Sequence, residues 1–254
     1  MWSIAQVTLP SLEDLTIEGM DNVIAIWHNQ LPLESWCKLR SLHLLRCTEL
    51  RNVFPSNILK GFQSLEDVSI DDCQSIKEIF DLGGVNSEEI HDIETIPLRI
   101  LDLRRLCSLK SIWNKDPQGL VSFQNLQSLK VVGCSCLKYI FPITVAEGLV
   151  QLKFLGIKDC GVEEIVANEN GDEVMSSLFP ELTSLTLKRL NNLKGFYRGT
   201  RIARWPHLKS LIMWKSGQVE TLFQEIHSPI QQSFFLLEKV WFGFSPFLLP
   251  YLDC

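Results

Sequence analysis

The sequence predicts an α/β solenoid, in which short parallel strands stack side by side and each repeat supplies one strand. The first observation is an apolar spacing that occurs twice between residues 123 and 165. Leu129 and Val131 are two residues apart, with apolar residues at steps of three on both sides, and Leu155 and Ile157 repeat the arrangement. A step of two places both side chains on one face of a strand, whereas steps of three fit a chain that turns a corner. One such unit needs neighbours to bury its apolar face, so the pattern indicates a leucine-rich repeat.

The second observation is that the first strand leucine returns along the whole chain. It falls at Leu12, Leu39, Leu65, Leu98, Leu126, Leu152, Leu182, Leu208 and Leu237, at intervals of 26 to 33 residues. These intervals lie at or just above the upper end of the range for leucine-rich repeats. Repeats starting near residues 9, 36, 62, 95, 123, 149, 179, 205 and 234 leave almost no chain over. We therefore expect a single leucine-rich repeat domain over residues 1–254.

A slower period of three repeats is the third observation. Repeats one, four and seven end in an aromatic phrase. Repeats two and five carry a cysteine followed by Phe54-Pro55 or Phe141-Pro142, and repeats three and six carry a cysteine followed by an acidic insertion, at 81–94 and 167–177. Since Leu12 and Leu98 are 86 residues apart and Leu98 and Leu182 are 84 apart, the pattern indicates duplication of a three-repeat block.

The expected architecture is a curved horseshoe or arc with about nine short parallel strands on its concave face, at roughly 4.8 Å spacing. The return segments should be mostly irregular or short-helical. The best helical candidates are residues 143–152 and 56–65.

Composition excludes several classes of protein. The hydrophobic fraction of 46% and the charged fraction of 21% are those of an ordinary soluble chain with a core, and the formal charge of −6 argues against a general nucleic-acid binder. The N-terminus lacks a basic segment followed by an apolar run, and no Asn lies in a glycosylation sequon, which favours the cytoplasm. The apolar stretch at 234–252 contains two charged residues and two prolines, so we expect no membrane span.

Three phrases carry a resemblance to a known family. They are CxxLxxIFP at 134–142, LPSLEDLTIEGMDNVIAIW at 9–27 and FPELTSLTLKRLNNLKGF at 179–196. In combination they resemble the C-terminal repeats of plant coiled-coil NLR (NB-LRR) disease-resistance proteins, which are intracellular nucleotide-binding immune receptors. The resemblance covers about residues 9–242.

The resemblance implies a protein-interaction module that recognises pathogen effectors or guarded host proteins and helps to hold the nucleotide-binding module inactive. It does not imply a nucleotide site here, because no G-x-x-x-x-G-K-Ser/Thr phosphate loop occurs in these residues. The tail at 242–254 continues the repeat poorly, so we expect a fragment of a larger receptor. The alternative is a substrate-recruiting repeat module of a ubiquitin ligase adaptor, although the Thr-Asp step typical of those repeats is missing after the cysteines.

The cysteine positions indicate a structural role in the core and not a metal site. Cys47, Cys73, Cys134 and Cys160 occupy one slot in four repeats, where we expect a buried column. Cys134-x-Cys136 has no second Cys/His pair at ligand spacing, so neither a metal nor a cofactor is expected.

The histidines offer little support for catalysis, and we expect no enzyme. His43 alone should point outward on the sheet, with Asp14 and Ser69 on neighbouring strands, but such trios arise by chance on a surface of this composition.

The concave face is the expected binding surface for a protein partner. Its polarity should run from acidic in the first strands to basic in the later ones, which favours steering of a charged partner. Trp214 and Trp241 occupy outward positions on the last two strands with lysines beside them, and they are candidate hot-spot residues. The proposed protein-binding residues are Asp67, Asp71, Arg104, Lys130, Phe154, Lys158, Lys188, Trp214 and Trp241.

Overall fold

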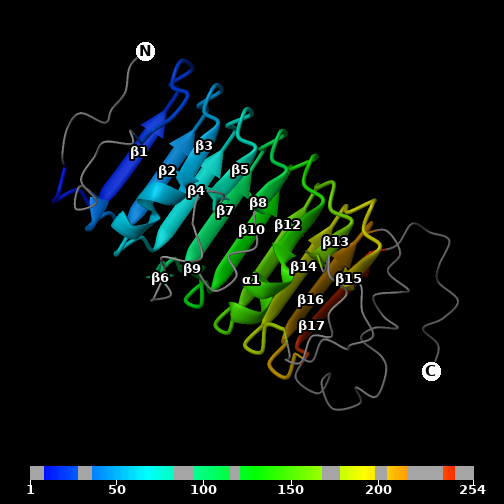
Figure 1. Ribbon diagram of the computed structural model, residues 1–254. Helices are drawn as coiled ribbons and strands as arrows, with labels where there is room; N and C mark the ends of the chain where they lie inside the picture. The colour runs from blue at the N-terminus through cyan, green and yellow to red at the C-terminus, as the bar shows by residue number, and fades with distance from the viewer. Residues whose placement is uncertain are drawn as a thin grey trace, which may run out of the picture.

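A computed structural model describes residues 9–27, 36–82, 94–114, 121–167, 178–197, 205–216 and 237–243. The repeats stack into an elongated solenoid with the N-terminal repeat at one end and the C-terminal repeat at the other (Figure 1). Its main sheet has nine strands, all parallel, in the order β1-β2-β4-β7-β10-β12-β14-β16-β17. They are β1 (Asp14–Glu18), β2 (Ser41–Leu45), β4 (Asp67–Asp71), β7 (Ile100–Arg104), β10 (Ser128–Val132), β12 (Phe154–Lys158), β14 (Ser184–Lys188), β16 (Ser210–Trp214) and β17 (Lys239–Gly243). The predicted nine-stranded solenoid is confirmed.

The strands of the main sheet pair without stagger. Leu129 on β10 lies opposite Leu101 on β7 and Leu155 on β12, so equivalent leucines form one continuous row. From β2 to β16 these inward side chains are buried, and Leu15 on β1 is partly buried, whereas the residues between them are at least partly exposed in most strands. The predicted inward and outward positions are therefore confirmed. On β17 the inward residue Val240 is 47% exposed.

The chain turns its first corner at the residue that follows each main strand. Eight of these corner residues have positive φ, which is the left-handed region that L-residues other than Gly, Asn and Asp rarely enter. Each corner N–H donates to the carbonyl at the end of the next strand, as in Arg46 to Asp71 (3.0 Å) and Arg105 to Val132 (2.8 Å). The corner residues are Gly19, Arg46, Asp72, Arg105, Gly133, Asp159, Arg189 and Lys215. Pairing between repeats thus holds a backbone conformation that is locally unfavourable.

The predicted cysteine column lies just inside this corner. Cys47, Cys73, Cys134 and Cys160 are all buried, and their thiols donate to backbone carbonyls. The contact from Cys160 Sγ to the Lys158 carbonyl oxygen is 3.1 Å. A hydrogen bond to the neighbouring thiol, together with burial, raises the pKa of Cys73 and Cys134, so these thiols stay protonated. The described cysteines form no disulfide. The column has a structural role, because its thiols bind backbone carbonyls beside the corner.

The return segments are more regular than predicted. Six of them contain short strands that form two further parallel sheets, β3-β5-β8 and β11-β13-β15. A two-stranded sheet joins β6 (Glu94–Thr95) to β9 (Val121–Ser122). The six strands are β3 (Asn52–Pro55), β5 (Glu78–Asp81), β8 (Ser111–Trp113), β11 (Tyr139–Pro142), β13 (Glu164–Ala167) and β15 (Gly195–Tyr197). Outside these strands of two to four residues, the described parts of the returns are irregular or contain one short helix, as expected.

The three-repeat period of the sequence appears in these return sheets. Each begins with a strand that ends in Phe-Pro, β3 with Pro55 and β11 with Pro142. Proline has no N–H to donate to the preceding repeat, so a Phe-Pro strand is suited to the edge of a sheet. A helix of six residues follows each proline, the 3₁₀ helix η2 (Ser56–Gly61) and the α-helix α1 (Ile143–Gly148). Both lie within the predicted helical ranges.

A file of aromatic rings fills the core along the return side. Phe80 stacks on Phe54 at 5.1 Å and on Trp113 at 6.0 Å between ring centroids. Trp113 then contacts Phe141 at 5.5 Å, which links the first three-stranded return sheet to the second. Through further ring contacts the file continues to Trp205. All of these rings are buried, and four of them belong to the aromatic endings and Phe-Pro phrases noted in the sequence, namely Phe54, Trp113, Phe141 and Phe196.

Candidate functional site

The candidate site is the outer face of the main sheet, defined by the outward side chains of the nine strands. It is the face expected to be concave. β1, β2, β4 and β7 carry five carboxylates and one arginine on this face. β10, β12, β14, β16 and β17 carry four lysines and no carboxylate. The strand residues therefore run from acidic to basic, as predicted.

Ion pairs compensate most of the charge in the acidic half. Arg104 donates two hydrogen bonds to Asp102 on the same strand, at 2.9 and 2.6 Å, and these bonds raise the pKa of Arg104. Lys130 Nζ lies 3.9 Å from the same carboxylate. Asp71 pairs with the corner residue Arg105 at 2.8 Å. Arg104 and Lys130 thus belong to one paired network around Asp102, and Asp71 pairs separately with its corner residue.

Asp67 stands apart from that network. It lies at the start of β4, and burial raises the pKa of its carboxyl group, while the nearby His43 opposes that rise. Among the described residues His43 makes no hydrogen bond with Asp14 or Ser69, so the trio considered for catalysis is not assembled.

The basic half has more cations than carboxylates. Within the strands and corners that the structure describes, Asp159 is its one carboxylate, and Arg189 binds it through two hydrogen bonds, which lower the pKa of Asp159. Lys158 Nζ lies 3.9 Å from the same group. Within the described part of the chain, Lys188 and Lys239 have no ion-pair partner. Lys158 and Lys188 are also directly opposite on β12 and β14, an arrangement of like charges that is destabilising.

Trp214 and Trp241 stack on each other at the C-terminal end of this face. Their centroids are 5.9 Å apart and the rings are inclined by 25°. Lys188 Nζ lies over Trp241 at 5.6 Å, and two corner cations, Arg189 and Lys215, lie over Trp214 at 5.8 and 5.7 Å. Trp241 remains 49% exposed. The structure brings together three of the predicted site residues, Lys188, Trp214 and Trp241, in what we call the tryptophan–cation cluster, which also includes Arg189 and Lys215.

Two glycines on the outer face make room for aromatic rings. A Cβ atom built on Gly243 would lie 2.5 Å from Trp214, and one on Gly156 would lie 2.9 Å from Phe154. Both rings therefore lie over glycine backbone instead of standing free in solvent. Phe154 is the last predicted site residue, and it packs against its own strand, away from the tryptophans.

Sequence reasoning placed Lys215 beside the tryptophans, but it missed the other corner cation, Arg189, as part of the site. Arg189 and Lys215 lie one residue beyond their strands, outside the alternation that selects outward positions. Their φ angles of 51° and 47° are left-handed, and both residues lie at the rim of the outer face, where the chain leaves the strand. The recurrence of a charged residue immediately after the strand, at positions 46, 72, 105, 159, 189 and 215, was the available signal. The sequence also allows an alternative to a hot spot, in which residues 246–252 fold back and cover both tryptophans, and those residues lie outside the described part of the chain.

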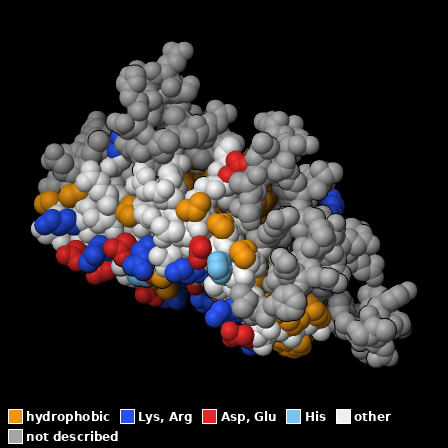
Figure 2. Space-filling model, turned by 90° about the horizontal axis from the view of Figure 1, so that it is seen from below, with side chains coloured by type: hydrophobic (Ala, Val, Ile, Leu, Met, Phe, Trp, Pro, Cys, Tyr) orange, Lys and Arg blue, Asp and Glu red, His pale blue; other side chains and the backbone are white. Residues whose placement is uncertain are grey.

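Charges of both signs lie along the edge where the strands begin. Arg40 and Arg99 flank Glu66 at 3.3 and 3.5 Å, and Lys209 lies 3.4 Å from Glu238. Seen from below, Lys and Arg side chains are interspersed with Asp and Glu along one edge of the molecule (Figure 2). Exposed pairs of this kind contribute little, so this edge is a solvated surface.

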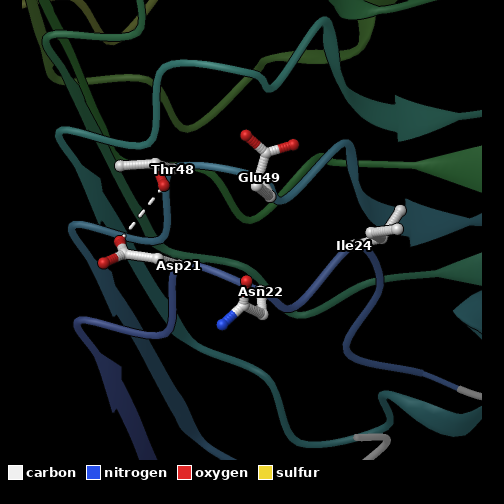
Figure 3. Close-up of a pocket in the computed structure, with 5 residues that line it drawn as sticks. All are labelled: Asp21, Asn22, Ile24, Thr48 and Glu49. Carbon is white, nitrogen blue, oxygen red and sulfur yellow. Dashed lines mark hydrogen bonds between the residues drawn. The ribbon is translucent and has the colours of Figure 1, made fainter. Parts of the chain in front are cut away.

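A shallow depression lies beyond the first two main strands. It is lined by Asp21, Asn22, Ile24, Thr48 and Glu49, and Thr48 donates a 3.1 Å hydrogen bond to Asp21 (Figure 3). The described residues contain no cluster of three or more His, Cys, Asp or Glu side chains placed to hold a metal ion. Within the same residues, none of the helices has the length and apolar character needed to cross a membrane.

Comparison with known proteins identifies the repeats. The family model described as "Plant disease resistance protein RPS2-like, leucine-rich repeats" matches residues 11–161. No curated protein and no solved structure matches the chain.

Proposed function

The chain belongs to the RPS2-like leucine-rich repeat family of plant disease resistance proteins, and on that premise we propose that it is the recognition module of a cytoplasmic immune receptor. Leucine-rich repeats of this kind are a non-catalytic, protein-binding module. In the proposed role the outer face binds a pathogen effector or a guarded host protein, and it helps to keep the receptor's nucleotide-binding module inactive. The unbroken strand pairing from β1 to β17 supports a single repeat domain.

The observation that carries the proposal is the tryptophan–cation cluster. Large aromatic and arginine side chains supply much of the energy at protein interfaces, above all when they gather near one another. Here a partly exposed tryptophan pair lies beside cations, of which Lys188 and Lys215 have no carboxylate partner within the described residues. We propose Asp67, Asp71, Arg104, Lys130, Phe154 and Lys158 as the surrounding contact surface.

The test uses an intact receptor that contains these repeats, expressed in leaf tissue and scored for cell death. The double change Lys188→Glu with Trp241→Ala should either abolish the triggered response or produce a constitutive one. The first result follows from lost recognition and the second from lost autoinhibition. Lys110→Glu is the matched control, because Lys110 is exposed on the return side next to β8. A double variant that accumulates and responds like the control would contradict the proposal.

A further inference from the structure

We infer that the C-terminal half of the outer face binds an acidic protein segment with an apolar or aromatic side chain among its carboxylates. The inference rests on the proposed function, and it adds the chemistry of the partner at the same surface. The surface extends from β12 to β17 and includes the tryptophan–cation cluster, Lys158 and Lys239.

The first step is the charge excess. Lys158, Lys188, Arg189, Lys215 and Lys239 surround this half, and among the described residues of its strands and corners Asp159 is the one carboxylate. Arg189 already occupies both oxygens of Asp159. The ammonium groups therefore repel one another, most directly across the register pair Lys158 and Lys188. Carboxylates from a partner relieve this repulsion and gain charge-assisted hydrogen bonds.

The second step concerns the apolar contact. Both tryptophan rings reach solvent, because Trp241 is 49% exposed although it stacks on Trp214, which is itself partly exposed. A purely ionic partner would leave these surfaces in water. An apolar or aromatic side chain between the partner's carboxylates covers Trp241 while the cations stay within reach of the acids, because Lys188 lies over that ring.

The third step excludes a nucleic acid. A strand of regularly spaced phosphates lying across the main sheet would meet the five carboxylates of β1, β4 and β7, and the chain as a whole has a formal charge of −6. Salt-dependent phosphate binding requires a continuous row of cations, which ends at β10. The polarity of the face instead favours a short acidic segment confined to its C-terminal half.

The experiment measures the binding of fluorescein-labelled peptides to the purified full chain by fluorescence anisotropy. The probe is a short peptide of alternating Asp and Leu with one central Phe. One comparison peptide has Asn for every Asp, and another has Ser for every Leu and Phe. Each replacement should weaken binding at least about tenfold, and higher salt should weaken binding of the first peptide. A short oligo-thymidine is the nucleic-acid competitor.

Protein variants place the binding on the surface. Lys188→Glu and Trp241→Ala should each weaken binding of the acidic peptide at least about tenfold, whereas Lys110→Glu should leave it unchanged. Trp241 is preferred over Trp214 because Trp214 also covers Gly243. Lys239→Glu is a second charge reversal, at an exposed strand position. Melting curves establish that each variant is folded.

The inference is overturned by equal binding of the Asp and Asn peptides, by equal loss in the control, or by full displacement with oligo-thymidine. These failures are distinct from failure of the proposed function. If the face variants change the leaf response but no acidic peptide binds, the partner chemistry is wrong and the recognition role stands. If the peptide binds at this face but the leaf response does not change, the recognition role is wrong.

Discussion

Glu163 lies between two lysines at an exposed corner, with Lys138 Nζ at 2.7 Å and Lys194 Nζ at 2.6 Å from its two oxygens. These hydrogen bonds lower its pKa to about 2. Because the folded pKa is below the unfolded one, its contribution to stability is present above the unfolded pKa and is lost as pH falls toward about 2.

We therefore expect the melting temperature of the wild type to exceed that of Glu163→Gln near neutral pH. The difference should shrink progressively at acidic pH, and also in concentrated salt, because the Glu163 side chain is partly exposed to solvent and both lysines are exposed. Thermal melts of both proteins across this pH range provide the measurement. If the difference in melting temperature stays constant as pH falls, the two lysines do not form these ion pairs with Glu163 in solution.

Leu129 and Lys130 are adjacent residues with opposite roles. Leu129 is fully buried between Leu101 and Leu155, so Leu129→Asp removes packing and places a carboxylate in the core. The expected loss is about 4 kcal/mol or more. Lys130 has a 41% exposed side chain and a long ion pair, so Lys130→Gln should change stability by less than about 0.5 kcal/mol. Chemical denaturation compares the two, and similar losses would mean that the strand register is wrong.

At the scale of the element, one glycine sets the shape of a corner. The sixth repeat is one residue shorter after its cysteine than the fifth, and Gly161 occupies the shortened position. A Cβ atom at Gly161 would lie 1.9 Å from the Ser135 carbonyl oxygen, which is backbone and cannot rotate away. Gly148 at the end of α1 is the matched control, since a Cβ atom there meets nothing within 4 Å.

We expect Gly161→Ala to destabilise the protein by about 1–3 kcal/mol. Gly148→Ala should be neutral or stabilising by up to about 1 kcal/mol, because it restricts the unfolded chain. Urea unfolding of both variants tests the contrast. If Gly161→Ala proves as stable as Gly148→Ala, the two repeats are not in backbone contact at this corner.

The main strands were predictable from sequence, whereas the return strands were not. A main strand has alternate residues facing the core and solvent, so its period of two is visible in the sequence. A return strand such as β8 has all three of its residues buried, and a short apolar run carries no period. The Phe-Pro phrases and the aromatic endings indicate that the return segments contribute to the core. They do not indicate that these segments pair as strands.

The sequence predicted which strand residues lie on the outer face, but it predicted only some of the contacts between their side chains. Alternation indicated Lys188, Trp214 and Trp241, but it did not indicate that Trp214 lies over Gly243. Nor did it indicate the corner cations, since their orientation depends on a left-handed φ that the local sequence Lys188-Arg189 does not reveal. Such a conformation is imposed by the pairing of neighbouring repeats, which is a tertiary effect.

At the scale of the whole molecule, the aromatic file couples one repeat to the next. Trp113 is fully buried and contacts Phe80, Phe123 and Phe141, so it joins the two halves of the solenoid. Stability in a repeat protein is roughly a sum of repeat and nearest-neighbour terms, so weakening a central interface can separate the unfolding of the two sides.

Trp113→Ala should therefore cost about 3–5 kcal/mol and broaden or split the thermal transition. Trp205→Ala is the control, because Trp205 contacts Phe196 at the described end of the file. It should lower the melting temperature and leave a single transition. Calorimetry distinguishes the two profiles, and a single sharp transition for Trp113→Ala would show that coupling across the centre does not depend on the rings.

The unstaggered pairing of the main sheet has a consequence for how such a surface can diversify. Because every outward position is opposite its equivalent in the next repeat, the face is a grid in which one residue can be exchanged without displacing its neighbours. One residue inserted into a strand, by contrast, would turn every following side chain of that strand to the opposite side. Length can therefore vary only outside the main strands, and the repeat intervals of 26 to 33 residues differ there. New specificities can arise by point substitution on an unchanged frame.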